Sequence, residues 1–261
     1  MTVFLPIKIN MAKPRPYVLS IAGSDPSAGA GVFADLKTFE AHKVYGLGVV
    51  SAITYQNDDT FTGVDWVPVE SIIRQVELIL MKFPVKVVKI GLIQSLPTLK
   101  TLLDYLLQVN PEMKIIWDPI LKASAGFTFH AEVNQLTLQN ILTKLYLLTP
   151  NAEEARKLAL ANSTEESAEH LSQYCPVLLK GGHREDKLGW DMLHLATGEK
   201  YSYRPKVQNA TPKHGSGCVL SAAVVSNLAL DYKLSRACLR AKAYTARFLS
   251  SNSTLLGYHK I

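Results

Sequence analysis

Cysteine is scarce in this sequence, and its few copies stand far apart. The 261 residues include only Cys175, Cys218 and Cys238, and none of these belongs to a Cys-x-x-Cys pair. An odd number of widely spaced cysteines argues against a disulfide framework and against a structural zinc site. We therefore expect three reduced thiols, the usual state of cysteine in the cytoplasm.

Long apolar runs and long runs of one charge are missing as well. No stretch reaches the roughly 18–20 apolar residues of a membrane-spanning helix, and we identify no signal peptide at the start. The formal net charge is +6, but lysine and arginine are scattered, which argues against a nucleic-acid-binding arm. We expect a cytoplasmic protein that binds small anions such as nucleotides, and neither nucleic acid nor a membrane.

Apolar residues, in contrast, are plentiful. With 48% hydrophobic and 19% charged residues, the composition is that of an ordinary globular protein. Pro14 and Pro16 indicate an extended N-terminal leader over residues 1–16. The absence of a linker or an internal repeat predicts a single domain over residues 17–261.

Short β-branched runs alternate with segments of 3.6-residue periodicity. The runs predict strands over 17–22, 48–55, 85–91, 114–118, 145–149 and 177–180, and a hairpin over 190–195 and 200–203. The periodic segments predict helices over 32–42, 69–83, 97–108, 132–143, 152–161, 216–230 and 235–250. Buried strands joined by helices form a mostly parallel sheet covered on both faces. The predicted fold class is therefore α/β, a three-layer α/β/α domain.

Ligands bind such sheets beyond the carboxyl ends of the strands, so the loops there are the candidate sites. The first, IAGSDPSAGAGVFADLKTF at residues 21–39, has three glycines between a strand and a helix. Glycine allows close approach to the backbone, and amides at a helix start attract anions. Residues 29–34 also match a dinucleotide-binding fingerprint, but too far from the strand for a strong match. A plain flexible connection stays open.

The second loop is AITYQNDD, residues 52–59, which places Gln56 after a strand. The amide of glutamine donates and accepts hydrogen bonds, as the edge of a heterocycle requires. The local sequence by itself favours an ordinary turn.

Two carboxylates and an amide follow later strands. Asp118 comes directly after a buried strand, and Asn151 and Glu154 lie in LLTPNAEEA. Oxygen ligands of this kind suit Mg²⁺ beside a nucleotide phosphate. Asn151 and Glu154 also have the spacing of a helix capping box. The two roles are compatible.

Two further segments offer positive charge or hydrogen-bond donors. Lys180 ends a strand in VLLKGGH, where its ammonium could bind phosphate or could extend along the strand end without a ligand. In HGSGC, Gly215, Ser216, Gly217 and Cys218 begin a predicted helix, whose amides and dipole can stabilise negative charge. We expect a lowered pKa for a thiol there. Core filling is the alternative for Cys218.

Together, these segments resemble the hydroxymethylpyrimidine/phosphomethylpyrimidine kinases of thiamine biosynthesis, within the ribokinase-like superfamily. The resemblance runs from about residue 17 to 249 and keeps the motifs in order: the 21–39 segment, YQND, WDPI, LLTPNAEEA, LLKGGH and HGSGC. The cysteine in HGSGC is the most discriminating feature, since sugar kinases of the superfamily carry an aspartate there.

The resemblance implies ATP-dependent phosphorylation of 4-amino-5-hydroxymethyl-2-methylpyrimidine, and then of its monophosphate. It implies that Gln56, Gly23 and Asp35 bind the pyrimidine and that Cys218 faces the substrate hydroxyl as base or proton relay. The implied phosphate-binding groups are Lys180 and the amides of residues 215–218. Asp118, Asn151 and Glu154 would organise Mg²⁺ and its waters. The family is commonly dimeric, so we also expect a homodimer.

The chain departs from the family pattern in two places. The family usually ends with a Gly- and Lys-containing segment whose lysine approaches the phosphates, whereas this chain ends in LLGYHKI. Whether Lys260 takes the place of that lysine stays open, and the difference bears on the second phosphorylation more than on the first. LKASAGFTF also lacks a Lys-Ser-Gly-Asp run after the Asp-Pro. The alternatives are a pyridoxal kinase, against which Gln56 argues, an NAD-dependent dehydrogenase and a non-catalytic pyrimidine-binding sensor.

Overall fold

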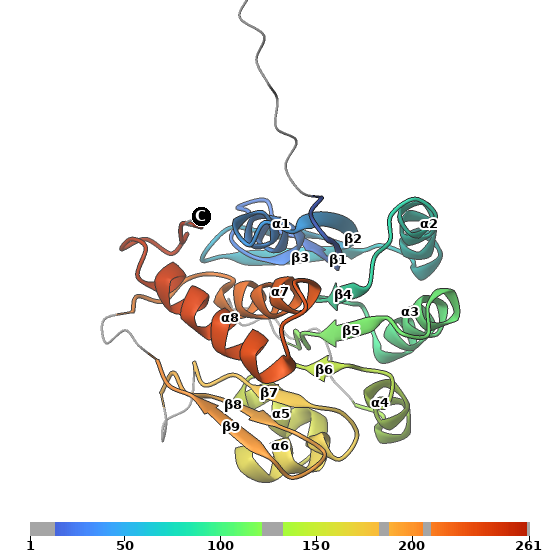
Figure 1. Ribbon diagram of the computed structural model, residues 1–261. Helices are drawn as coiled ribbons and strands as arrows, with labels where there is room; N and C mark the ends of the chain where they lie inside the picture. The colour runs from blue at the N-terminus through green and yellow to red at the C-terminus, as the bar shows by residue number, and fades with distance from the viewer. Residues whose placement is uncertain (1–13, 122–132, 183–187, 206–209, 260–261) are drawn as a thin grey trace, which may run out of the picture.

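The computed structural model of the chain describes residues 14–121, 133–182, 188–205 and 210–259 (Figure 1). The strands are β1 (Tyr17–Ser24), β2 (Tyr45–Gln56), β3 (Phe61–Trp66), β4 (Val87–Ile90), β5 (Lys114–Trp117), β6 (Leu147–Leu148), β7 (Val177–Leu179), β8 (Asp191–His194) and β9 (Lys200–Tyr203). The helices are α1 (Gly31–Ala41), α2 (Val69–Leu80), α3 (Leu96–Val109), α4 (Gln135–Leu142), α5 (Ala152–Ala159), α6 (Thr164–Ser172), α7 (Ser216–Ala229) and α8 (Leu234–Leu249).

One sheet contains every described strand, in the order β3-β2-β1-β4-β5-β6-β7-β8-β9. The six strands from β2 to β7 in this order pair in parallel, while β3 and the β8–β9 hairpin are antiparallel additions at the two edges. Chain order changes direction between β1 and β4, because the chain first moves outward through β2 and β3. The mostly parallel sheet of the prediction is confirmed.

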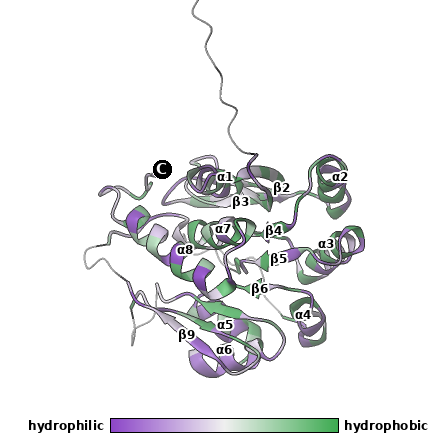
Figure 2. Cartoon of the chain, viewed as in Figure 1, coloured by the Kyte–Doolittle hydropathy of each residue, from purple (hydrophilic) through white to green (hydrophobic). Residues whose placement is uncertain are grey.

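Helices cover both faces of the sheet. One apolar cluster packs α1, α7 and α8 against the sheet, and another packs helices α2 to α6 against the opposite face. Figure 1 shows α7 and α8 on one side of β4, β5 and β6, with α3 and α4 on the other. In Figure 2 these central strands are coloured as hydrophobic, as expected for strands buried on both faces. The three-layer fold class is confirmed.

The sequence missed two elements, β3 and α6. Strand β3 has no fully buried residue, so its side chains carry little apolar periodicity. Helix α6 reads TEESAEHLS and buries only small residues and Leu171. Both elements are short and peripheral, so few apolar residues mark them.

Some expectations concern residues outside the described ranges. These include residues 1–13 of the leader, most of LKASAGFTF and Lys260. Within the described part of the chain, no helix has both the length and the apolar character needed to cross a membrane.

Candidate active site

The candidate residues meet at the carboxyl edge of the parallel strands. Backbone hydrogen bonds keep the strand ends level: the amide of Asp118 donates to the carbonyl of Ile90 (2.8 Å), and that of Lys180 donates to the carbonyl of Pro150 (2.8 Å). Residues that follow different strands are thereby placed side by side, although they lie far apart in the sequence.

Asp118 and Lys180 form a buried ion pair at this edge. Lys180 Nζ lies 2.6 Å from Asp118 Oδ1, and the exposed fractions of the two side chains are 11% and 1%. Thr149 Oγ1 donates to the same oxygen (3.1 Å), and Ser221 Oγ donates to the other (2.9 Å). Burial raises the pKa of Asp118, but the charges of Lys180 and Lys89 and these hydrogen bonds outweigh it and lower the pKa overall. Asp118 is therefore ionised and fully engaged.

Asn151 and Glu154 form the capping box that their spacing suggested. The Glu154 amide donates to Asn151 Oδ1 (2.9 Å), and the Asn151 amide donates to Glu154 Oε2 (2.7 Å). Glu154 Oε2 is also 3.6 Å from Lys180 Nζ. Burial raises the pKa of Glu154 to about 7, against the opposing charge of Lys180. Glu154 thus caps α5 and also lies beside the Lys180–Asp118 ion pair.

The ammonium of Lys180 lies between two carboxylates and close to the start of α7. Burial lowers its pKa, but Asp118 and Glu154 outweigh burial and raise the pKa above the ordinary lysine value. A Cβ atom on Gly217 would lie 3.4 Å from Nζ, so the cation is next to the first turn of α7. Gly181 fixes the chain beyond Lys180, since its backbone approaches Trp190 too closely for any Cβ.

The residue that precedes the first turn of α7 is a glycine whose backbone lies in the left-handed region. Gly215 is the N-cap with φ +70°, and a Cβ there would lie 2.1 Å from the carbonyl oxygen of Gly29. The Ser216 amide donates to the carbonyl of Lys213 (3.3 Å), so it belongs to the turn that leads into the helix. Gly217 and Cys218 follow in the first helical turn, where amides have no intrahelical acceptor. The structure thus brings the ammonium of Lys180 next to a helix start whose first amides have no intrahelical acceptor.

Cys218 differs from the sequence-based expectation. Its side chain is buried, and burial raises the pKa of the thiol to about 11, against the opposing charge of Lys89. The predicted lowering of the pKa is wrong, because loss of water outweighs the helix start and the neighbouring cation. At neutral pH the group is a thiol rather than a thiolate.

A second lysine–aspartate pair lies behind Cys218. Lys89 Nζ is 2.6 Å from Asp35 Oδ1, with both side chains fully buried, and Ser20 Oγ donates to Asp35 Oδ2 (2.5 Å). Burial raises the pKa of Asp35 to about 6, although Lys89 opposes the shift. Asp35 is therefore engaged inside the protein rather than exposed to a ligand. Lys89 was not among the residues predicted for the site, although a lysine within the apolar strand VVKI is an unusual signal.

The glycine-rich loop after β1 is organised by Asp25, which was also missed. Its carboxylate is buried and accepts hydrogen bonds from the amides of Ser27 (2.9 Å), Gly29 (3.1 Å) and Ala30 (2.7 Å). Oδ2 also lies 2.8 Å from His214 Nε2. The Asp25–His214 contact joins this loop to the one before α7. The loop is therefore a fixed structure rather than a flexible connection.

Gln56 and Gly23 lie at a third position on the edge, around Thr54. Gln56 Nε2 donates to Thr54 Oγ1 (2.8 Å), which in turn donates to the carbonyl of Ser24 (2.5 Å). A Cβ on Gly23 would lie 3.0 Å from the Leu92 side chain and 3.5 Å from that of Thr54. The structure thus places both Gln56 and Gly23 next to Thr54. None of the described contacts joins Gln56 to Cys218 or Lys180.

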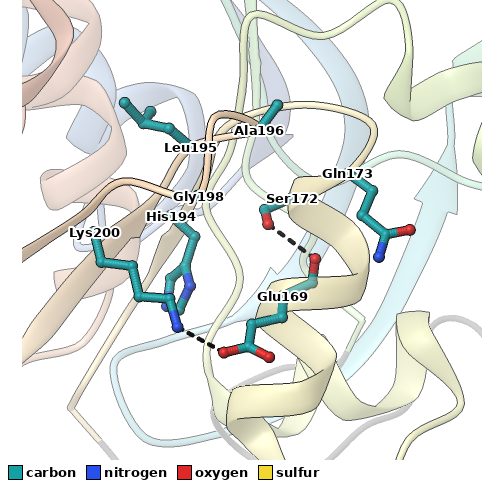
Figure 3. Close-up of a pocket in the computed structure, with 8 residues that line it drawn as sticks. All are labelled: Glu169, Ser172, Gln173, His194, Leu195, Ala196, Gly198 and Lys200. Carbon is teal, nitrogen blue, oxygen red and sulfur yellow. Dashed lines mark hydrogen bonds and ion pairs between the residues drawn. The ribbon is translucent and has the colours of Figure 1, made fainter.

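A pocket of about 320 Å³ lies between α6 and the β8–β9 hairpin, at the end of the sheet opposite to the carboxyl ends of the parallel strands (Figure 3). Its lining comes from α6 and the β8–β9 hairpin: Glu169, Ser172, Gln173, His194, Leu195, Ala196, Gly198 and Lys200. His194 pairs with Val177, the first residue of β7, whereas Lys180 follows the last. The pocket is therefore separate from the strand ends that carry the candidate site.

Comparison with known proteins identifies the family. The phosphomethylpyrimidine kinase family model matches residues 25–260. The chain belongs to the phosphomethylpyrimidine kinase family. A hydroxymethylpyrimidine/phosphomethylpyrimidine kinase of Rhizobium meliloti (strain 1021) is 33% identical over 247 residues, which cover 91% of each chain. Several other curated relatives are longer proteins, and the chain spans about half the length of these.

Solved structures of family members and relatives share the fold. The phosphomethylpyrimidine kinase of Clostridium difficile 630 is 30% identical, with a TM-score of 0.75 over 89% of this chain and 99% of that one. A pyridoxal kinase of Staphylococcus aureus, solved in complex with ADP, is 26% identical, with a TM-score of 0.77 over 91% of this chain and 89% of that one. The ribokinase-like kinase fold expected from the motifs is confirmed.

Proposed function

We propose that this phosphomethylpyrimidine kinase family member transfers a phosphoryl group from ATP to the hydroxymethyl group of 4-amino-5-hydroxymethyl-2-methylpyrimidine. The observation that carries the proposal is the meeting of Lys180 with the start of α7 at the carboxyl edge of the sheet. A cation beside first-turn amides suits the charge of a transferring phosphoryl group. Family membership favours this kinase over the dehydrogenase and the non-catalytic sensor.

Cys218 is proposed to face the substrate hydroxyl. Phosphoryl transfer needs positioning and charge neutralisation more than covalent help from the protein. Because the thiol is protonated at neutral pH, we assign it to orienting the hydroxyl and to relaying its proton. As the oxygen–phosphorus bond forms, the Sγ–H proton passes to a phosphoryl oxygen and the sulfur accepts the proton of the substrate hydroxyl, so that the thiol is regenerated. Lys89, behind the thiol, favours release of the Sγ proton, since its positive charge opposes the rise in the thiol's pKa.

Gln56 and Gly23 are proposed to bind the pyrimidine. The carboxamide of Gln56 lies half-buried at the last residue of β2, and its orientation is fixed by Thr54. One face of this amide can donate and the other can accept, which matches the amino group and ring nitrogen of an aminopyrimidine. Asp35 supports the pocket indirectly, because its carboxylate is held by Lys89 and Ser20 inside the protein.

Mg²⁺ is proposed to enter with ATP. Asp118, Asn151 and Glu154 supply oxygen atoms, which Mg²⁺ prefers. Lys180 Nζ lies between the two carboxylates at 2.6 and 3.6 Å, so contact through water suits this arrangement better than direct ligation. Among the described residues, no three His, Cys, Asp or Glu side chains form a metal-binding group. The ion would neutralise phosphate charge, and ATP itself would supply part of its coordination.

A second transfer, onto the monophosphate, is the proposed next step in thiamine biosynthesis. The product of the first step carries a phosphate that needs positive charge near Cys218. Lys180 is the candidate for this charge, since its Nζ would lie 3.4 Å from a Cβ on Gly217 in the first turn of α7.

The kinase proposal is tested with purified protein, Mg-ATP and three acceptors: the hydroxymethylpyrimidine, its monophosphate and pyridoxal. We expect ADP and the pyrimidine monophosphate and pyrophosphate as products, identified by mass spectrometry. No ADP above background with any acceptor would refute the proposal. Pyridoxal is the second candidate, because the S. aureus pyridoxal kinase has the same fold at a TM-score of 0.77; a kcat/KM for pyridoxal above that for the pyrimidine would establish it.

The proposal extends to the oligomeric state and the cellular location of the protein. We propose a homodimer in the cytoplasm, supported by the exposed apolar side chains of Tyr45, Ile53 and Tyr55 on β2 and by three unpaired, buried cysteines. A second copy would bury apolar surface on β2. Light scattering that gives the mass of a single chain at micromolar concentration would rule out the dimer.

A further inference from the structure

Lys213 is a buried lysine whose ammonium is surrounded by uncharged oxygens. Its Nζ donates to Thr211 Oγ1 (2.8 Å), to the carbonyl (2.6 Å) and side-chain oxygen (3.0 Å) of Asn252, and to the carbonyl of Thr254. Backbone carbonyl, amide and hydroxyl oxygens are also the ligands that proteins offer to hard cations. The ammonium of Lys213 thus occupies a cage of the kind that could hold a monovalent cation.

Two other lysines that are largely enclosed, Lys89 and Lys180, are arranged differently. Lys89 pairs with Asp35 and Lys180 with Asp118, each at 2.6 Å. The four oxygens around Lys213 carry no formal charge, and burial lowers the pKa of its amine. Hydrogen bonds to a charged donor are nonetheless stronger than those between neutral groups. The contacts of Lys213 therefore hold two chain segments together rather than neutralising an acid.

These two segments are the turn before α7 and the C-terminal segment, defined here as residues 252–256. Besides the ammonium, the amide of His214 donates to the carbonyl of Leu255 (2.9 Å). The C-terminal segment also reaches the glycine-rich loop, since a Cβ on Gly29 would lie 2.8 Å from the Leu256 side chain. The carbonyl of Lys213 itself accepts from the Ser216 amide in the turn into α7. A shift of Lys213 would therefore displace the start of α7.

We propose that the ammonium of Lys213 acts as a tethered monovalent cation, which clamps residues 252–256 to the turn before α7 and so positions the amides that bind the transferring phosphoryl group. The role of Lys213 as a positioning residue rests on the proposed kinase function, whereas the clamp itself does not. Because the cation is part of the chain, the wild-type enzyme needs no free K⁺ or NH₄⁺.

Two variants separate the charge of Lys213 from its bulk. Lys213→Ala empties the cage but keeps its oxygens, so a free NH₄⁺ or K⁺ ion can enter. Lys213→Met fills the same space with an apolar group that excludes the ion. Lys100→Ala is the matched control, since Lys100 is an exposed lysine of α3 that pairs with Asp104. Each protein is assayed in choline, ammonium and potassium chloride at equal ionic strength.

We expect wild type and Lys100→Ala to have the same kcat/KM for ATP in all three salts. Lys213→Ala should lose about tenfold or more in choline chloride, the effect of losing charged hydrogen bonds, and recover most of it in ammonium or potassium chloride. Lys213→Met should stay low in every salt. Equal activity of Lys213→Ala and wild type, or an equal loss in all three salts, would overturn the proposal.

Thermal unfolding in the same salts tests the clamp without the kinase reaction. Ammonium and potassium should raise the Tm of Lys213→Ala above its value in choline, because an ion that binds only the folded state stabilises it. Wild-type Tm should not respond. If no acceptor is phosphorylated, the kinase proposal fails while this measurement still decides the clamp. If Lys213→Ala does not fold, the wild-type protein still tests the proposal. Higher activity or a higher Tm of wild type in potassium than in choline chloride would contradict a cage that Lys213 already fills. Equal values in the two salts would support it.

Discussion

Two buried lysine–aspartate pairs flank the start of α7, and they differ in one respect. Both have an Nζ–Oδ1 distance of 2.6 Å, but Lys89 and Asp35 are sealed from solvent, whereas the Lys180 side chain is 11% exposed. A charged side chain without solvent access, such as Lys89, can act on a neighbour only through its electric field. A side chain with some solvent access, such as Lys180, can also contact a ligand. We therefore assign the Lys89 pair to stability and to the environment of Cys218, and the Lys180 pair to phosphate binding.

The sealed pair should show the largest effect on stability. Lys89→Met leaves Asp35 buried without its cation, which typically costs about 3–5 kcal/mol. Urea unfolding should show this loss, and the double variant Lys89→Met/Asp35→Leu should regain part of it, because it removes the stranded charge. If Lys89→Met were no less stable than Lys180→Met, the contrast between the pairs would fail.

The Lys180 pair, whose lysine side chain is 11% exposed, should show the largest effect on activity. Lys180→Met is expected to lower kcat/KM for ATP by about 10²–10³-fold, as removal of one charge-stabilising donor does. Asp118 keeps its hydrogen bonds from Thr149 and Ser221, so stability should fall less than in Lys89→Met. Lys200→Met is the matched control, since Lys200 pairs with Glu169 at 2.6 Å near the opposite edge of the sheet. A Lys180→Met enzyme with normal steady-state kinetics would remove Lys180 from the site.

The reactivity of Cys218 reports on the field of the sealed pair. A pKa of about 11, against an ordinary value near 8.5, predicts alkylation by iodoacetamide at least about 100-fold slower than for a free thiol at pH 7.5. The rate should rise about tenfold per pH unit up to that pKa. Lys89→Met should slow the reaction further, because Lys89 favours the thiolate. Peptide mapping separates Cys218 from Cys175 and Cys238; reaction at the rate of a free thiol would contradict the raised pKa.

Removal of the thiol tests its role next to the substrate. Cys218→Ala should lower kcat by about 10–100-fold, within the lower range of acid–base contributions, and leave the unfolding midpoint nearly unchanged. Steady-state kinetics and thermal unfolding measure the two quantities. A lower midpoint with unchanged kcat would show instead that Cys218 fills core space.

The smallest effect is expected at Gln56, which belongs to neither pair. Gln56→Ala should raise KM for the pyrimidine by about 3–10-fold, which corresponds to the loss of one or two neutral hydrogen bonds. KM for ATP should stay unchanged. Gln173→Ala changes the same residue type in the pocket at the opposite edge and serves as control. An unchanged KM for the pyrimidine in Gln56→Ala would contradict the assignment.

Much of the architecture could be predicted because it is local. The capping box of Asn151 and Glu154 follows from their spacing, and the parallel strands follow from short apolar runs separated by helices. Helix α6 was missed because its apolar content is low, yet Ser163 accepts from the Glu166 amide at 3.2 Å, and this Ser-x-x-Glu spacing is a helix-start signal. Strand β3 carries no comparable signal, since its residues are only partly buried.

The sequence predicted which residues lie at the strand ends and at the start of α7, but not their electrostatics. The helix-start argument placed Cys218 next to an anion-binding turn, but it gave the wrong direction for the thiol's pKa because burial cannot be deduced from the local sequence. Asp25 and His214 were missed for a related reason. Their contact joins residues 189 positions apart, and only the packing of two loops creates it.

The sequence by itself determined which residues follow the strand ends, where the glycines allow close backbone approach, and which family the motifs resemble. These features depend on short-range spacing, which the chain carries without reference to its fold. Only the tertiary structure decided that Lys89 is sealed, that Lys180 reaches the start of α7, and that Lys213 clamps the C-terminal segment. Each of these outcomes depends on burial and on charges from distant segments. Such charges act strongly only after folding has excluded water from between them.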